Sequence, residues 1–269
     1  MIPYHDADGV TLYRGDALAV LADLETASVD ALITDPPYSS GGFTRGDRTA
    51  DVHSKYVGSE QNARGTGGAA LGAFGGDNRD QRGMGYWCAL WLGECLRVVK
   101  PGGAAVLFTD WRQLPIVTDV LQAGGFVWRG IVPWVKLSAR PQAGRFTSQC
   151  EYVVWGTAGA RPFDYSEPPL PGFYQAAAPR DREHITQKPV DVMRGLVKIA
   201  PEGGVVLDPF MGAGTTGVAA ALERREFVGV ELTDHYAEVA QRRIVEAAQG
   251  VAASRGAQPS MFGDDEAAA

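Results

Sequence analysis

Short apolar runs alternate along this chain with segments whose apolar residues recur at helical spacing, and this alternation limits the folds open to it. The runs predict strands at 10–13, 28–34, 104–108, 126–135, 152–155, 205–207 and 227–230. The intervening segments predict helices at 17–24, 84–99, 111–122, 190–200, 215–224 and 235–248, with a turn at 100–103 that closes the second helix. Strands that alternate with helices favour a parallel, doubly wound sheet, so we expect an α/β fold with helices on both faces.

Two long insertions interrupt this alternation. Residues 39–82 are rich in Gly, Arg, Asp and Asn without a sustained period, and a loop of that length is typical of a segment that covers a substrate. Residues 137–183 contain the second insertion, and the prolines of 161–183 predict no regular structure there. We expect residues 1–250 to form a single domain, followed by a disordered tail at 251–269.

The net charge of −7 is unevenly distributed. Residues 1–38 hold seven acidic side chains and one basic side chain, whereas residues 129–188 hold eight basic and five acidic ones. A basic middle within an acidic chain is expected of a surface that faces phosphates. Neither a basic apolar leader nor an apolar run of bilayer length is present, which predicts a soluble, cytoplasmic protein without a membrane partner.

Cysteine and histidine spacing indicates neither a disulfide framework nor a metal site. Cys88, Cys95 and Cys150 lack Cys-x-x-Cys spacing, and the four histidines form no metal-ligand spacing. We therefore expect no metal, and we expect the cysteines to be small apolar core residues of a reduced protein. The six tryptophans, Trp87, Trp91 and Trp128 among them, are also expected in the core.

A glycine-rich turn joins the sixth expected strand to the helix that follows it. Gly212, Gly214 and Gly217 match G-x-G-x-x-G, and Glu231 ends the next strand. Such a turn lets the backbone approach a nucleotide and such a carboxylate accepts ribose hydroxyls, although glycines can also simply shape a tight turn. Asp208 precedes the turn, where an anion suits a ligand with an ammonium and a sulfonium better than a pyrophosphate. The turn therefore favours S-adenosylmethionine over NAD.

The stretch Asp35-Pro36-Pro37-Tyr38 follows a buried strand. Its prolines disfavour helix, so the Asp35 carboxylate and the Pro36 carbonyl are expected to face the crevice beyond the sheet. Together they make a pair of acceptors for an NH₂ group, and Tyr38 offers a face on which a planar base can stack. These residues predict a seat for the exocyclic amine of adenine or cytosine.

That seat and the glycine turn together predict methyl transfer from a sulfonium to an aromatic amine. The lone pair of such an amine is delocalised into its ring, and two acceptors that hold its protons would direct the lone pair at the methyl group. The chemistry needs no metal and no covalent intermediate. A base must leave the duplex to reach such a pocket, so we expect base flipping.

The chain resembles the amino-group DNA methyltransferases, which use S-adenosylmethionine. Three motifs carry the resemblance, which covers residues 12–244: Asp35 to Tyr38, Asp208 to Thr216 ("DPFMGAGTT") and His184 to Pro189 ("HITQKP"). The catalytic motif precedes the cofactor turn, as in the group called beta, which is a circular permutation of the Rossmann-like methyltransferase fold. The permutation implies that the last expected strand lies beside the first.

The resemblance also implies roles for individual residues. The motif Asp35 to Tyr38 would be catalytic, and Asp35 would also border the cofactor. The other cofactor-binding residues would be Asp16, Thr186, Gln187, Lys188, Asp208, Pro209, Phe210, Gly212, Gly214, Thr215, Thr216 and Glu231. Glu231 would hold the ribose and Asp16 the adenine amine, although an Asp at that position is equally suited to cap the helix that follows it.

The first position of the catalytic motif bears on the choice of base. In the family an aspartate there goes mostly with adenine, so Asp35 favours N6-adenine, with N4-cytosine as the alternative. Cytosine C5 methylation requires a thiol that follows a proline in the family, and no cysteine here follows one. Double-stranded DNA is the expected partner, and both a homodimer and a restriction-modification role are compatible with the resemblance. We expect residues 39–82 to form a loop that covers the DNA and residues 137–183 to be a candidate target-recognition region. Their arginines available for phosphates or guanine edges are Arg45, Arg48, Arg64, Arg79, Arg82, Arg140, Arg145 and Arg161.

Three other functions stay open. An NAD-dependent oxidoreductase would explain the glycine turn and Glu231 but not "DPPY" or "TQKP". An RNA or protein amine methyltransferase would share the chemistry, although Asp35 and the permuted order count against it. A catalytically silent DNA-binding module would keep the fold around a damaged pocket.

Overall fold

The computed structural model of the chain describes residues 1–37, 80–137, 139, 141, 143–162, 168–177 and 187–256. Tyr38, His184 and Thr186 lie outside the described residues, together with most of the first insertion and residues 257–269. The predictions made for those positions therefore stay predictions.

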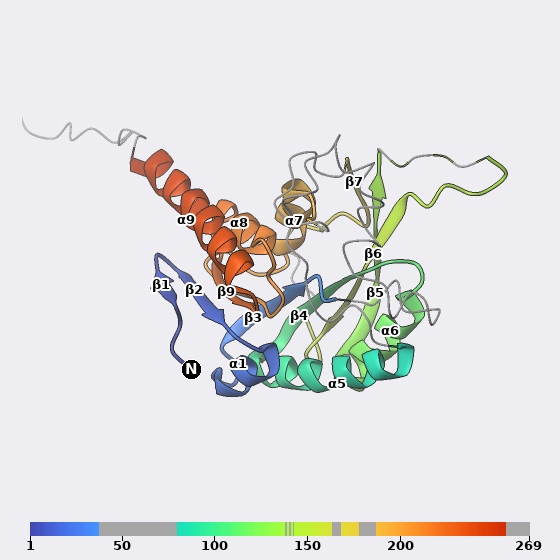
Figure 1. Cartoon of the computed structure of the whole chain (residues 1–269), viewed down its shortest axis with the longest axis horizontal. Coiled ribbons are helices and arrows are strands. Elements are labelled where there is room, and N and C mark those ends of the chain that lie inside the picture. Colours follow the sequence, from blue (N-terminus) through green and yellow to red (C-terminus); the bar gives the residue numbers. More distant parts are fainter. Residues whose placement is uncertain are drawn as a thin grey trace, which may run out of the picture.

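Nine strands within the described residues form one sheet, in the order β1-β2-β9-β8-β3-β4-β6-β5-β7 (Figure 1). The strands are β1 (His5–Ala7), β2 (Val10–Arg14), β3 (Val29–Thr34), β4 (Val99–Thr109), β5 (Val127–Lys136), β6 (Cys150–Thr157), β7 (Tyr174–Ala176), β8 (Val205–Asp208) and β9 (Glu226–Glu231). The helices are α1 (Ala17–Asp23), α5 (Gln81–Val98), α6 (Leu114–Ala123), α7 (Val190–Val197), α8 (Thr215–Leu222) and α9 (Asp234–Gly256). Each predicted strand and helix thus has a counterpart.

The first and last long strands of the chain lie side by side. β2 pairs in parallel with β9, from Val10 opposite Phe227 to Arg14 opposite Glu231. β9 then continues the parallel sheet through β8 and β3 to β4. This pairing is the one that the circular permutation requires, and it confirms that prediction.

The sheet is mixed rather than wholly parallel as predicted. β6 is antiparallel to both its neighbours, β4 and β5, and β1 is antiparallel to β2. The cause is local, because the chain passes from β5 to β6 without a helix among the described residues that connect them. Adjacent strands need a long crossover, usually a helix, to run parallel.

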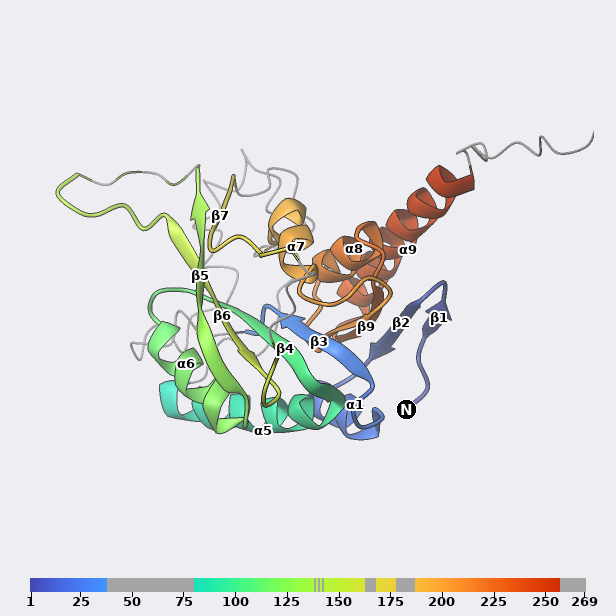
Figure 2. The ribbon, with the colours of Figure 1, turned by 180° about the vertical axis from the view of Figure 1, so that it is seen from behind.

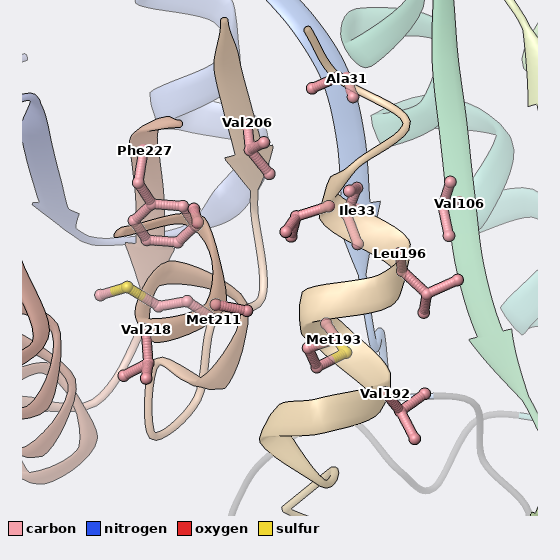
Figure 3. Close-up of a cluster of buried hydrophobic side chains, with 14 of the residues drawn as sticks. Ala31, Ile33, Val106, Val192, Met193, Leu196, Val206, Met211, Val218 and Phe227 are labelled. Atoms are coloured by element: carbon pink, nitrogen blue, oxygen red, sulfur yellow. The ribbon is translucent and has the colours of Figure 1, made fainter. Parts of the chain in front are cut away.

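Helices cover both faces of the sheet, as predicted. α7, α8 and α9 lie on one face, and α1, α5 and α6 lie on the other (Figures 1 and 2). Successive residues of β3 point to opposite faces. Ile33 therefore belongs to the hydrophobic core beneath α7, α8 and α9, the first core, and Leu32 belongs to the second core, beneath α1, α5 and α6. Figure 3 shows Met193 and Leu196 of α7 over Ile33 and Val106 in the first core.

Three local predictions were wrong. Residues 100–103 belong to β4 and form a bulge, since Val29 pairs with Val99 but Ala31 already pairs with Ala104. The proline-rich stretch 161–183 contains the strand β7, which is stabilised by pairing with β5. α9 continues to Gly256, past the expected start of the disordered tail.

The predicted core residues are mostly buried. Cys88, Cys95 and Trp91 are buried. Cys150 is only partly buried, and Trp128 and Trp111 are 43% and 58% exposed, contrary to the prediction for these residues. No helix in the described part of the chain has the length and apolar character needed to cross a membrane.

Candidate active site

An acidic residue ends or follows each of the five parallel strands. In the spatial order β2, β9, β8, β3 and β4, these residues are Asp16, Glu231, Asp208, Asp35 and Asp110. Because the carboxyl ends of parallel strands share one edge of the sheet, the five acids lie along that edge. The edge therefore gathers the acids of the glycine turn and the acid of the proline motif, as the sequence predicted.

The two motifs meet where β3 and β8 end. Ala31 and Leu32 of β3 pair with Val206 and Leu207 of β8. Beyond these pairs, the Thr34 hydroxyl donates a hydrogen bond of 2.6 Å to Oδ1 of Asp208. This buried bond joins the strand that carries Asp35 directly to the entrance of the glycine turn.

Asp208 holds the glycine turn through hydrogen bonds to its carboxylate. Its carboxylate also accepts from the Thr216 hydroxyl at 2.5 Å and from the Phe210 backbone N–H at 3.1 Å. The residue is only 2% exposed. This burial raises the pKa of Asp208 to about 6, because desolvation outweighs the three hydrogen bonds and the charge of Asp35 adds to it.

The glycine turn is held from both sides. Gly212 and Gly214 have positive φ angles of 50° and 76°, which side chains rarely allow. Oε2 of Glu231 accepts from the Gly212 N–H at 3.1 Å. Arg243 of α9 donates to the Ala213 carbonyl. The turn is thus fixed by its two neighbouring elements as well as by Asp208.

An aromatic cluster joins the turn to α5. The ring of Phe210 lies 5.3 Å from that of Trp87 and 5.0 Å from that of Trp91, centroid to centroid. These tilted and edge-on arrangements are favourable for aromatic pairs. α5 therefore supports the glycine turn on the face of the sheet opposite α8.

The ammonium of Lys188 contacts the carboxylate of Asp35, the proposed catalytic residue. Its ammonium donates to Oδ2 of Asp35 at 2.6 Å and lies 3.2 Å from Oε2 of Glu151. Burial alone would lower the pKa of Lys188, but the two carboxylates outweigh burial and raise it. The sequence assigned Lys188 to the cofactor pocket, and the structure brings its charge to Asp35.

Glu151 and Lys136 were not found by sequence reasoning. Glu151 is the second residue of β6, and its Oε1 forms a close ion pair with the ammonium of Lys136 at the end of β5. Burial would raise the pKa of Glu151, but Lys188 and Lys136 lower it below its ordinary value. The only signal in the sequence is an acid directly before an apolar run.

The remaining predicted residues are placed as follows. Asp16 caps α1, since its Oδ1 accepts from the Ala19 N–H at 3.2 Å, so the helix-cap interpretation is confirmed. Pro36 is buried two residues after β3, which ends at Thr34 as predicted. Thr215 and Thr216 are buried at the start of α8.

The chemistry of this edge fits S-adenosylmethionine. The strand-end side chains around the glycine turn, Asp16, Asp208 and Glu231, are all acidic. Carboxylates suit a ligand with an ammonium, an amine and a ribose diol, and they would repel a pyrophosphate. Among the described residues, no cluster of three His, Cys, Asp or Glu could hold a metal ion.

Known proteins resemble the chain over most of its length. The family model described as DNA methylase, of the N6/N4 methyltransferases, matches residues 29–242. A curated relative named as a methylase, YubD of Escherichia coli (strain K12), is 27% identical over 233 residues, which cover 86% of this chain and 88% of YubD.

Solved structures share the fold. A DNA modification methylase of Thermus thermophilus, complexed with S-adenosyl-L-methionine, has a TM-score of 0.60 and 22% identity, covering 89% of this chain and 96% of that one. The PvuII DNA methyltransferase, which is cytosine-N4-specific, has a TM-score of 0.65 and 16% identity, covering 93% and 94%. These likenesses agree with the permuted Rossmann-like methyltransferase fold predicted from the sequence.

Proposed function

Because this chain belongs to the DNA methylase family of the N6/N4 methyltransferases, we propose that it methylates the exocyclic N6 amine of adenine in double-stranded DNA, with S-adenosylmethionine as the methyl donor. The observation that carries the proposal is the hydrogen bond from Thr34 to Asp208, which joins the amine seat to the cofactor turn. The acceptor strand end and the donor turn are thereby parts of one site.

The cofactor supplies an electrophilic methyl group when it is bound. Glu231 would accept hydrogen bonds from the ribose hydroxyls, and the charge of Asp208 would attract the ammonium. Asp16, whose Oδ1 caps α1, would hold the adenine amine with the same carboxylate. The buried hydroxyls of Thr215 and Thr216 shape the methionine end of the site.

Asp35 performs the central task on the substrate. Its carboxylate and the Pro36 carbonyl accept hydrogen bonds from the two N–H groups of the amine, which directs the lone pair toward the methyl group. When the N–C bond forms, the bond from sulfur to methyl breaks, S-adenosylhomocysteine leaves, and the amine releases one proton to solvent. Lys188 donates a hydrogen bond of 2.6 Å to Oδ2 of Asp35 and so helps to orient this carboxylate. Tyr38, outside the described residues, is proposed to stack on the flipped base.

The choice of adenine rests on Asp35, and the site chemistry is shared with cytosine N4 methylation. Incubation with labelled S-adenosylmethionine and unmethylated genomic DNA, followed by digestion to nucleosides and mass spectrometry, tests it. We expect N6-methyladenine. N4-methylcytosine would refute the adenine assignment, and absence of label from DNA would refute both. Parallel RNA and protein substrates should stay unlabelled.

A further inference from the structure

Four alternating charges run from the active site toward the surface. They are Asp35 after β3, Lys188 before α7, Glu151 on β6 and Lys136 on β5. Their side chains are 21%, 5%, 15% and 27% exposed in that order, so the row of charges passes through a nearly closed interior. Only its first two members belong to recognised motifs.

The two outer members stand at the paired ends of β6 and β5, where Glu151 pairs with β5 and the pairing of β6 with β4 begins one residue later, at Tyr152. β6 is paired with β4 on one side and with β5 on the other. Glu151 lies opposite Trp134, and Lys136 is two residues further along β5, on the same face. The place of the Glu151 carboxylate is therefore set by the pairing of strands.

Lys188, in contrast, has a flexible four-carbon stem. Its ammonium lies between the Asp35 and Glu151 carboxylates and 5.2 Å from the centroid of the Phe108 ring. A side chain of this kind takes one position only where fixed partners hold it. Phe108 and Glu151 are strand residues, and they can set the position from which Lys188 meets Asp35.

We propose that Glu151, with Lys136 behind it, is a positioning residue for methyl transfer, because it fixes the ammonium of Lys188 and thereby the carboxylate of Asp35. This inference rests on the proposed function. Lys136 balances the second carboxylate, so the row carries no net charge and Lys188 is not drawn away from Asp35. A small displacement of Asp35 changes its direction toward the substrate amine, to which the rate of transfer is sensitive.

The test compares Glu151→Gln with a matched control. Glu223 is a suitable control because its carboxylate also bridges two cations, Arg194 at 2.7 Å and Lys198 at 3.3 Å, at the far end of α8 from the glycine turn. We expect E151Q to lower the single-turnover rate of methyl transfer about 10- to 100-fold. Dissociation constants for S-adenosylmethionine and DNA should change less than about threefold. E223Q should keep the wild-type rate.

A second comparison separates positioning from charge balance. The double variant Glu151→Gln with Lys136→Gln restores neutrality but not the partner of Lys188, so its rate should stay low. Recovery of the wild-type rate would overturn the positioning role. If E151Q does not fold, Lys136→Gln decides, with an expected loss in rate at unchanged affinities.

The outcomes also separate this inference from the proposed function. An inactive wild-type protein would remove the function and the inference together. An active wild type with E151Q at the same rate, or with rate and cofactor affinity lost in parallel, would overturn the inference alone.

Discussion

Asp208 shows how a single residue serves both the fold and the site. The carboxylate is buried, yet three donors from β3 and the glycine turn point at it. A neutral residue would be easier to bury, so the charge has a reason other than stability. The ammonium of the proposed cofactor supplies that reason.

The raised pKa of Asp208 predicts a pH dependence of stability. With a folded-state pKa of about 6 against an ordinary 3.8, the protonated form stabilises the fold at low pH, and this contribution is lost as the pH rises through 6. Asp208→Asn removes the titration. The free energy of unfolding of the variant, relative to wild type, should therefore rise by about 2 kcal/mol between pH 4.5 and 7.5.

Urea unfolding at the two pH values measures this difference. Carboxylates that do not interact with Asp208 titrate equally in both proteins, so the comparison reports on Asp208 together with its coupling to Asp35. A relative stability that does not change with pH would contradict the assignment. Isothermal titration should show that the same variant binds S-adenosylmethionine more weakly at neutral pH.

Residues of the site were predictable to the extent that their roles are local. Asp35, Asp208 and Glu231 follow apolar strands within short motifs, and parallel strands bring their ends together. Glu151 and Lys136 were not predictable, because their partnership depends on how β5 pairs with β6. Nothing in the sequence near either residue indicates that register.

The glycine turn and α8 pack closely against α9 and β9. Two glycines are needed for this close packing, which the sequence motif alone does not indicate. A Cβ on Gly217 would lie 2.5 Å from Cδ1 of Ile244 in α9 and 2.7 Å from Cε1 of Phe227 in β9. Gly214 would meet Ala240 of α9 at 2.9 Å. These two glycines are therefore explained by the close approach of α8 to its neighbours, whatever the turn binds.

Gly217→Ala should destabilise the fold by about 1 to 3 kcal/mol through overpacking. Gly93→Ala is the control, since Gly93 also lies within a helix but a Cβ there would meet nothing within 4 Å. That variant should gain about 0.5 to 1 kcal/mol from helix propensity. Thermal and urea unfolding of both variants measure the contrast, and equal effects would contradict the packing explanation.

Helices and strands with a clear periodicity of apolar residues were predicted from the sequence. Elements that depend on tertiary contacts were not. α5 and β3 followed from their apolar spacing. β7 has three residues and exists through its pairing with β5, so it has no period of its own. The bulge at 100–103 reads as a turn locally, because Pro and Gly favour both structures.

In the molecule as a whole, the circular permutation places β2, from the start of the chain, beside β9, the last strand. This pairing completes a row of five parallel strands whose carboxyl ends carry acids. The opposite edge carries structural charges instead. Asp30, near the start of β3, accepts from Lys100 at 2.8 Å and from the Val205 N–H at 2.8 Å. The proposed catalytic carboxylate and the structural carboxylate thus lie at opposite ends of β3.

Two aspartates at opposite ends of β3, Asp30 and Asp35, allow the assignment of the amine seat to Asp35 to be tested. Asp35 and Asp30 are both partly buried and paired with a lysine, at 2.6 Å and 2.8 Å. Asp35→Asn should lower single-turnover methyl transfer to DNA by about 100-fold or more, with the dissociation constant of S-adenosylmethionine changed only a few-fold. Asp30→Asn should lose stability and keep the transfer rate of the folded protein.

The most direct measurement is therefore the single-turnover rate of methyl transfer from labelled S-adenosylmethionine to DNA by these two variants. We expect D35N to lose transfer while it still binds the cofactor, and D30N to retain transfer. Transfer by D35N at the wild-type rate, or equal losses in both variants, would contradict the assignment of the amine seat to Asp35.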